Sequence, residues 1–133
     1  MKVVVARPPV YDDICAALGV PAETVVYTWG ETIFSPSGDF LPHDVLVHEN
    51  VHRMQQRAIG GPETWWATYL ADARFRFLQE LEAYQSQYRS YCEGVRDRNE
   101  RERFLTRIAG TLAGRLYGGV VTFGEARMRI KGV

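Results

Sequence analysis

Residues 42–57 read PHDVLVHENVHRMQQR, and this stretch decides how the rest of the chain is interpreted. It predicts a helix, because valines recur through it, no glycine or further proline interrupts it, and Pro42 suits a first helical turn. His48 and His52 are four residues apart. Residues at this spacing lie one turn apart on the same face of a helix. The two imidazoles can therefore bind one metal ion together.

Glu49 follows the first histidine directly, which gives the pattern His-Glu-x-x-His. A carboxylate at this position projects beside the metal rather than onto it, where it can take a proton from a bound water. The pattern is typical of zinc metallopeptidases, in which the histidines bind Zn²⁺ and the glutamate is the general base. The alternative is that two histidines decorate an ordinary helix, because so short a pattern also arises by chance.

The composition indicates one globular domain over residues 1–133. Apolar residues make up 46% of the chain and charged residues 24%, which excludes disordered and fibrous proteins. Cys15 and Cys92 stand far apart, so neither a thiolate metal site nor a disulfide framework is expected. No segment is long enough for a membrane span, and Pro8 and Pro9 interrupt the apolar start before it resembles a signal peptide. We expect a cytoplasmic protein with no membrane partner.

Charge is balanced over the whole chain but is distributed unevenly. The net charge is zero, yet residues 95–133 carry nine basic and four acidic side chains. An arginine-rich segment can bind nucleic acid. The alternating signs of RDRNERER at 96–103 are more typical of a solvated helix face with ion pairs. We therefore expect no nucleic-acid partner.

Local patterns predict a small sheet followed by helices, and therefore an α+β fold. Runs of β-branched and aromatic residues predict strands at 3–6, 24–29 and 31–34. Apolar residues at helical spacing predict the remaining helices, which lie within 11–20 and at 62–93, 99–117 and 122–130. Thr122 and Glu125 fit a capping box for the last helix. A strand before the metal helix could form an edge that accepts a substrate peptide, with plain core sheet as the alternative.

Two helices carry side chains whose roles the sequence leaves open. The helix expected over 62–93 has an apolar and aromatic stripe that should pack on the metal helix and the sheet. Trp66 and Phe75 fall outside this stripe and are expected to be exposed or inserted elsewhere. Gln55 and Gln56 continue the metal-side face of the metal helix. Either could contact substrate or a ligand, although a cap or an interhelical hydrogen bond is the more typical role.

A catalytic zinc site needs three protein ligands and an open position for water. His43 is the only other histidine, and its place in the helix points it away from the metal-side face. Asp44 shares that face but lies a turn back, so we expect it to support the site rather than bind the metal. Downstream, QELEAY at 79–84 offers Glu80 and Glu82. These two point to nearly opposite sides of a helix, so only one can face the metal.

With these residues the chain resembles the gluzincin branch of zinc metallopeptidases, in which His-Glu-x-x-His is followed on a second helix by Glu-x-x-Ser/Ala-Asp. The resemblance covers about residues 32–88 and extends to small phage- or prophage-type enzymes of this kind. It implies a minimal zincin-like domain, with a small N-terminal sheet packed against the metal helix and a second long helix. His48, His52 and Glu80 would then bind Zn²⁺. Glu49 would be the general base that acts on a peptide or protein substrate.

Two departures from that family concern the rest of the site. Tyr84 stands where the family has an aspartate that orients a zinc-bound histidine. No histidine follows His52, so another side chain would have to stabilise the oxyanion, and Tyr84 and Tyr117 are the candidates. The alternative function is a zinc-binding structural or interaction protein, such as a phage component, with a vestigial peptidase site.

Overall fold

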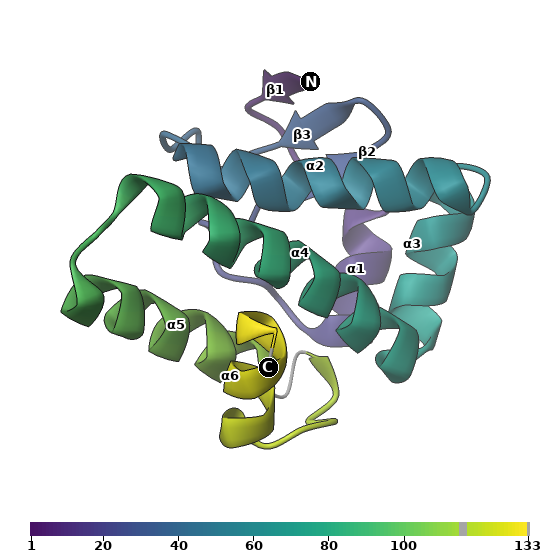
Figure 1. Cartoon of the computed structure of the whole chain (residues 1–133). Coiled ribbons are helices and arrows are strands. Elements are labelled where there is room, and N and C mark those ends of the chain that lie inside the picture. Colours follow the sequence, from purple (N-terminus) through teal and green to yellow (C-terminus); the bar gives the residue numbers. More distant parts are fainter. Residues whose placement is uncertain (115–116, 133) are drawn as a thin grey trace.

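The computed structural model describes residues 1–114 and 117–132 and has an α+β fold, which confirms the predicted fold class. This part of the chain forms six helices and a three-stranded sheet (Figure 1). In chain order the elements are β1 (Lys2–Val4), α1 (Tyr11–Leu18), β2 (Tyr27–Trp29), β3 (Thr32–Phe34), α2 (His43–Ala58), α3 (Pro62–Ala71), α4 (Ala73–Gly94), α5 (Arg98–Leu112) and α6 (Phe123–Lys131).

The sheet is mixed, with the strand order β1-β3-β2. β1 runs parallel to the central strand β3. β2 runs antiparallel to β3 and is joined to it by a tight turn in which Gly30 has a φ of 61°. All three predicted strands are present but shorter than expected. β3 ends at Phe34 because a turn begins at Ser35, whose carbonyl accepts a hydrogen bond from the Gly38 N–H. Residues 24–26 are therefore left without a strand partner and line a pocket instead.

The prediction of one helix over 62–93 is wrong, because the chain forms α3 and α4 with a break at Asp72. The Asp72 backbone is extended, with a φ of −127° and a ψ of 106°, and its carboxylate accepts hydrogen bonds from the N–H groups of Arg74 and Phe75. Aspartate is a favoured N-cap because it satisfies the free N–H groups of a first turn. The continuous aromatic stripe concealed this cap in the sequence.

The break redirects the aromatic side chains of α3 towards the sheet and α2. Trp66 is 6% exposed, and its indole N–H donates to the Thr28 carbonyl at 2.9 Å. Phe75 is half-buried, with its ring centroid 6.4 Å from that of Trp65. Of the two outcomes expected for Trp66 and Phe75, insertion into the fold therefore holds for both.

The C-terminal part packs as two helices against α4 (Figure 1). α5 ends at Leu112, short of the helix predicted over 99–117, and residues 115–116 of that prediction lie outside the described part of the chain. Thr122 caps α6 as predicted, because its hydroxyl accepts a hydrogen bond from the Glu125 N–H at 3.2 Å. The Glu125 carboxylate accepts from the same hydroxyl at 3.1 Å.

α2 and α4 lie side by side, and β2 packs against α2 (Figure 1). The hydrophobic core joins α1, the sheet and helices α3 to α6. Within the two described ranges, no helix is both long enough and apolar enough to cross a membrane. The packing of α2 on α4 is what brings the two motifs singled out in the sequence together.

Candidate metal centre

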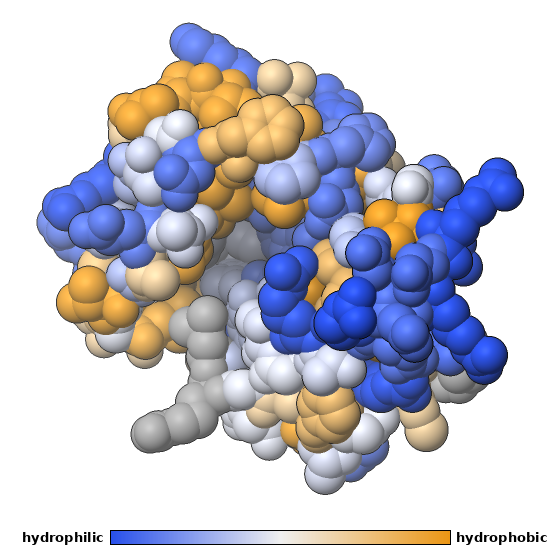
Figure 2. Space-filling model, turned by 90° about the vertical axis from the view of Figure 1, so that its left-hand side faces the viewer, coloured by the Kyte–Doolittle hydropathy of each residue, from blue (hydrophilic) through white to orange (hydrophobic). Residues whose placement is uncertain are grey.

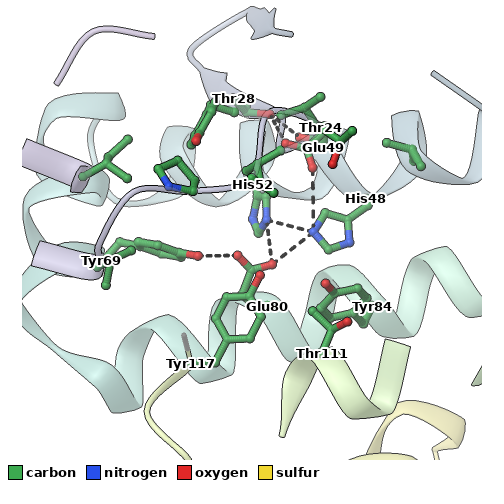
Figure 3. A pocket seen from close by; sticks show the side chains of 18 of the residues that line it. Thr24, Thr28, His48, Glu49, His52, Tyr69, Glu80, Tyr84, Thr111 and Tyr117 are labelled. Atoms are coloured by element: carbon green, nitrogen blue, oxygen red, sulfur yellow. Dashed lines mark hydrogen bonds and ion pairs between the residues drawn. The ribbon is translucent and has the colours of Figure 1, made fainter. Parts of the chain in front are cut away.

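Three side chains of α2 form a buried group that could hold a metal ion (Figure 3). His48, Glu49 and His52 are 7%, 5% and 5% exposed, and each offers a ligand atom within 4.8 Å of the others. The helix places the two imidazoles one turn apart, with their ring centroids separated by 4.9 Å. All three side chains line a pocket of about 720 Å³. The helical spacing predicted from the sequence is confirmed.

Glu80 approaches the same imidazoles from α4. Its Oε1 atom lies 3.0 Å from His48 Nε2 and 3.1 Å from His52 Nε2, and the two nitrogens are 3.2 Å apart. The three atoms therefore form a nearly equilateral triangle. Tetrahedral ligands at ordinary zinc distances lie about 3.3 Å from one another, so this triangle has the size of one face of a zinc site.

Proximity alone groups Glu49 with the histidines, but its contacts differ from those of Glu80. Glu49 Oε2 lies 3.7 Å from His48 Nε2, and Glu49 Oε1 accepts a hydrogen bond of 3.0 Å from the Thr28 hydroxyl. Glu80 is closer and contacts both imidazoles. We therefore favour Glu80 over Glu49 as the side chain best placed to complete the ligand set.

His48 is oriented by a glutamine of α4. Its Nδ1 lies 2.9 Å from Gln87 Oε1, while Gln87 Nε2 donates to Asp44 Oδ2 at 2.8 Å. An amide oxygen only accepts hydrogen bonds, so the proton of the neutral imidazole belongs on Nδ1 and the Nε2 lone pair faces the triangle. Asp44 thus supports the site from outside, as the sequence indicated.

His52 has a matching arrangement on its other side. Its Nδ1 lies 2.8 Å from Gln55 Oε1, and Gln55 Nε2 donates to Glu82 Oε1 at 2.9 Å. Glu82 is exposed and lies behind this glutamine, away from the triangle. Both imidazoles are therefore held by a glutamine that is itself anchored to a carboxylate. Such outer partners fix the tautomer and the ring orientation of metal-binding histidines.

The two buried carboxylates have opposite electrostatic surroundings. Burial raises the pKa of Glu49 above its usual range, although the charges of the two histidines oppose this. Burial also acts to raise the pKa of Glu80, but the charge of His52 and hydrogen bonds from both imidazoles outweigh it and hold that pKa well below its usual range. Glu49 thus has the affinity for a proton that a base needs, and Glu80 stays ionised as a ligand must.

His52 has the reciprocal shift. Burial acts to lower the pKa of His52, but the Glu80 carboxylate outweighs burial and raises it to about 9. The close approach of the two Nε2 atoms is consistent with a proton held between the imidazoles and Glu80 in the metal-free site. A metal ion would replace that proton, because only a neutral imidazole can bind metal.

Tyr69 of α3 holds the other oxygen of Glu80, a contact that the sequence did not reveal. Its hydroxyl donates to Glu80 Oε2 at 2.5 Å (Figure 3). Burial first, and then the charge of Glu80, raise the pKa of Tyr69 well above its usual range, so the hydroxyl keeps its proton. This pair cannot be predicted from the sequence pattern, because the break between α3 and α4 positions Tyr69 and the continuous stripe predicts no break there.

The two predicted tyrosines both line the pocket beside Glu80 (Figure 3). The Tyr84 ring lies edge-on to His48 with 4.6 Å between centroids, and the Tyr117 ring centroid is 6.5 Å from that of Tyr84. Burial is the main cause that raises the pKa of each tyrosine, so both are neutral donors. His43 is exposed at the start of α2 and does not join the group.

The pocket extends from the triangle to the segment after α1 on one side and to α5 on the other. Figure 2 shows a face of the molecule that is hollowed near its centre, with hydrophobic residues gathered on one side and hydrophilic residues on the other. Comparisons with protein-family models, curated proteins and solved structures found no match for this chain.

Proposed function

We propose that the protein is a zinc-dependent peptidase that hydrolyses peptide bonds through a metal-activated water. The observation that carries this proposal is that the two buried carboxylates have different partners. Glu80 Oε1 contacts both imidazoles at 3.0 and 3.1 Å, while Glu49 is held to one side by Thr28. Three ligands with a base beside them are what a catalytic zinc site requires.

His48, His52 and Glu80 would hold the metal. Two imidazoles and one carboxylate are a donor set that zinc accepts, and catalytic zinc sites use three protein ligands of these types. When bound, zinc polarises a carbonyl group and lowers the pKa of a coordinated water towards about 7. Proposing zinc rather than another divalent metal rests on this donor set and on the triangle's dimensions.

Glu49 would accept the proton of the attacking water and pass it to the leaving amine. Burial raises its pKa, which favours holding that proton for the time between the two transfers. The Thr28 hydroxyl donates a hydrogen bond to Glu49 Oε1 and so fixes the orientation of this carboxylate. Tyr84 and Tyr117 line the same pocket as neutral hydroxyl donors, and either would stabilise the negative charge that develops on the carbonyl oxygen.

The rival function, a zinc-binding structural or interaction protein with a vestigial site, makes no use of this arrangement. A purely structural zinc site is usually closed by four protein ligands. Here all three prospective ligands border an open pocket, and Glu49 occupies the position of a base rather than of a fourth ligand. These features support the peptidase over the structural role.

Removing and restoring the metal tests the proposed function. The purified protein is incubated with a mixture of short peptides, and the products are identified by mass spectrometry. We expect cleavage that a chelator abolishes, that stoichiometric Zn²⁺ restores and that Mg²⁺ does not. Cleavage that survives complete removal of metal would contradict the proposal, as would a zinc-loaded protein that cleaves no member of a broad peptide mixture.

A further inference from the structure

The edge of the sheet beside the metal centre is closed by a side chain of α2. Gln56 Oε1 accepts a hydrogen bond from the Gly30 N–H at 2.7 Å, and Gln56 Nε2 donates to the Thr28 carbonyl at 2.7 Å. Gln56 is 1% exposed. An amide that pairs with a strand in this way makes the hydrogen bonds that a neighbouring strand would make. An extended peptide therefore cannot pair with β2 at Thr28 and Gly30.

α3 closes the same side from behind. Trp66 donates a second hydrogen bond to the Thr28 carbonyl, at 2.9 Å, and Trp65 packs against His52 with 5.1 Å between ring centroids. Trp65 is 1% exposed. The pocket thus ends in packed, hydrogen-bonded side chains next to His52. A bound peptide has no room to continue past the metal centre in this direction.

The other end of the pocket offers an apolar wall. The last residue of α1 and the segment that leads to β2 contribute aliphatic residues to the lining: Leu18, Val20, Pro21, Val25 and Val26. Val20 is 85% exposed although it is apolar. Residues 24–26 precede the pairing of β2 with β3, so their backbone is not committed to the sheet. This wall suits an apolar side chain of a bound ligand.

Arg107 of α5 lines the same pocket. Apart from the two histidines, it is the only basic side chain among the described residues that line the pocket. Its guanidinium lies 5.2 Å from the centre of the Phe104 ring, and among the described residues it forms no ion pair with a carboxylate. A guanidinium in this position can bind a carboxylate through two parallel hydrogen bonds.

We propose that the substrates are short peptides with a free C-terminal carboxylate, which binds Arg107 while an apolar residue after the scissile bond packs against residues 18–26. The proposal rests on the proposed peptidase function and deepens it. The carboxyl side of the scissile bond then points to the open end of the pocket. The amino side points to the end that Gln56 and Trp66 close, so few residues can precede the scissile bond.

Binding of matched zinc ligands tests the carboxylate preference without relying on turnover. Two hydroxamates are compared by calorimetry on the zinc-loaded protein. Both carry two leucine-like residues after the metal-binding group, and one ends in a carboxylate and the other in a carboxamide. We expect the acid to bind at least about tenfold more tightly, because the carboxylate can form two parallel charge-assisted hydrogen bonds with the guanidinium and the carboxamide cannot.

Two arginine variants test whether Arg107 causes the preference for the acid over the amide. Arg107→Gln should bind the acid and the amide equally, whereas Arg103→Gln, an exposed position one turn earlier on α5 that does not line the metal pocket, should keep the preference. Equal binding of the two ligands by the wild type, or an unchanged preference in Arg107→Gln, would overturn the inference and leave the peptidase proposal intact. Failure of both hydroxamates to bind the zinc-loaded protein would overturn the two together.

The closed end is tested with a second pair of ligands. A phosphinic dipeptide analogue is compared with the same compound extended by two residues on its amino side. The extended compound should bind no more tightly than the short one, because Gln56 and Trp66 occupy the backbone positions it would use. A gain of about tenfold or more on extension would show that this side is open and would overturn the inference.

Discussion

Glu49 and Glu80 are the same residue type, are each 5% exposed and lie in the same pocket, yet their surroundings assign them opposite properties. The region around Glu49 on α2 supplies one hydroxyl, from Thr28, and burial raises the pKa of the carboxylate. The region around Glu80 on α4 supplies two imidazoles and the Tyr69 hydroxyl, and the pKa falls. The difference shows that the partners of a buried carboxylate, rather than its burial, decide whether its pKa rises or falls. In the proposed peptidase this would make Glu49 the base and Glu80 the ligand.

Glu49→Gln tests the proposed role of Glu49 as the base and should have the largest effect on activity. The amide keeps the shape and the Thr28 contact but cannot accept a proton, so kcat/KM for a cleaved peptide should fall by about a thousandfold while the bound zinc stays. Steady-state kinetics and elemental analysis on the same sample measure both quantities. A variant that retains most of its activity would show that Glu49 is not the base.

Tyr69→Phe tests the proposed role of Glu80 as a zinc ligand. Without the hydroxyl, Glu80 Oε2 loses its hydrogen-bond donor, and zinc affinity should fall by about 10- to 100-fold. Competition with a chelator of known affinity measures the change. Tyr91→Phe is the matched control. Tyr91 stacks on Phe104 and does not line the metal pocket, so this variant should bind zinc with unchanged affinity. Equal zinc affinities of the wild type and Tyr69→Phe would contradict the proposed role of Glu80 as a zinc ligand.

Zinc binding should depend on pH through His52. The pKa of His52 is raised from 6.5 to about 9 in the metal-free protein, so at pH 7 this imidazole carries a proton that zinc must displace. About one proton should leave for each zinc bound, and affinity should rise about tenfold per pH unit between pH 7 and 8. Calorimetry in two buffers with different ionisation enthalpies counts the protons. Affinity independent of pH in this window would contradict the shift.

The stabilising effect of the His52–Glu80 pair has a defined pH range in the metal-free protein. Because the pKa of His52 is higher in the folded protein than its ordinary value of 6.5, the contribution of this group is fully present below pH 6.5. It is lost as the pH rises through about 9. Zinc-loaded protein should lack this alkaline loss, since the metal has replaced the proton.

Thr28→Val gives the smallest expected effect and refines the comparison. Valine has the shape of threonine and suits a strand, but it removes the hydrogen bond to Glu49 Oε1. The carboxylate becomes less fixed, so kcat should fall by about tenfold at most, with zinc affinity unchanged. Zinc loss in this variant would show that Glu49, rather than Glu80, completes the ligand set.

The sequence predicted those parts of the site that depend on helical spacing. His48, Glu49 and His52 are neighbours within one helix, so their relative positions follow from its geometry alone. Glu80 was accessible through a second short motif, and its inward orientation followed from its place on an apolar face.

The supporting contacts could not be read from the sequence, because they join elements that are distant along the chain. Thr28 reaches Glu49 from β2, and Gln87 reaches His48 across 39 positions. Gln87 lies seven residues after Glu80, two helical turns along the same face, and this spacing was the one signal for it. The break at Asp72 was missed because an N-cap inside an apolar stripe competes with the helical pattern.

We propose that Glu80, and not Glu82, completes a zinc site with His48 and His52. Elemental analysis of purified wild-type protein, Glu80→Ala and Glu82→Ala tests it most directly. We predict about one zinc per chain in the wild type and in Glu82→Ala, and a loss of zinc in Glu80→Ala that still folds by circular dichroism. Zinc retained by Glu80→Ala, or a wild type that binds none after reconstitution, would contradict the account.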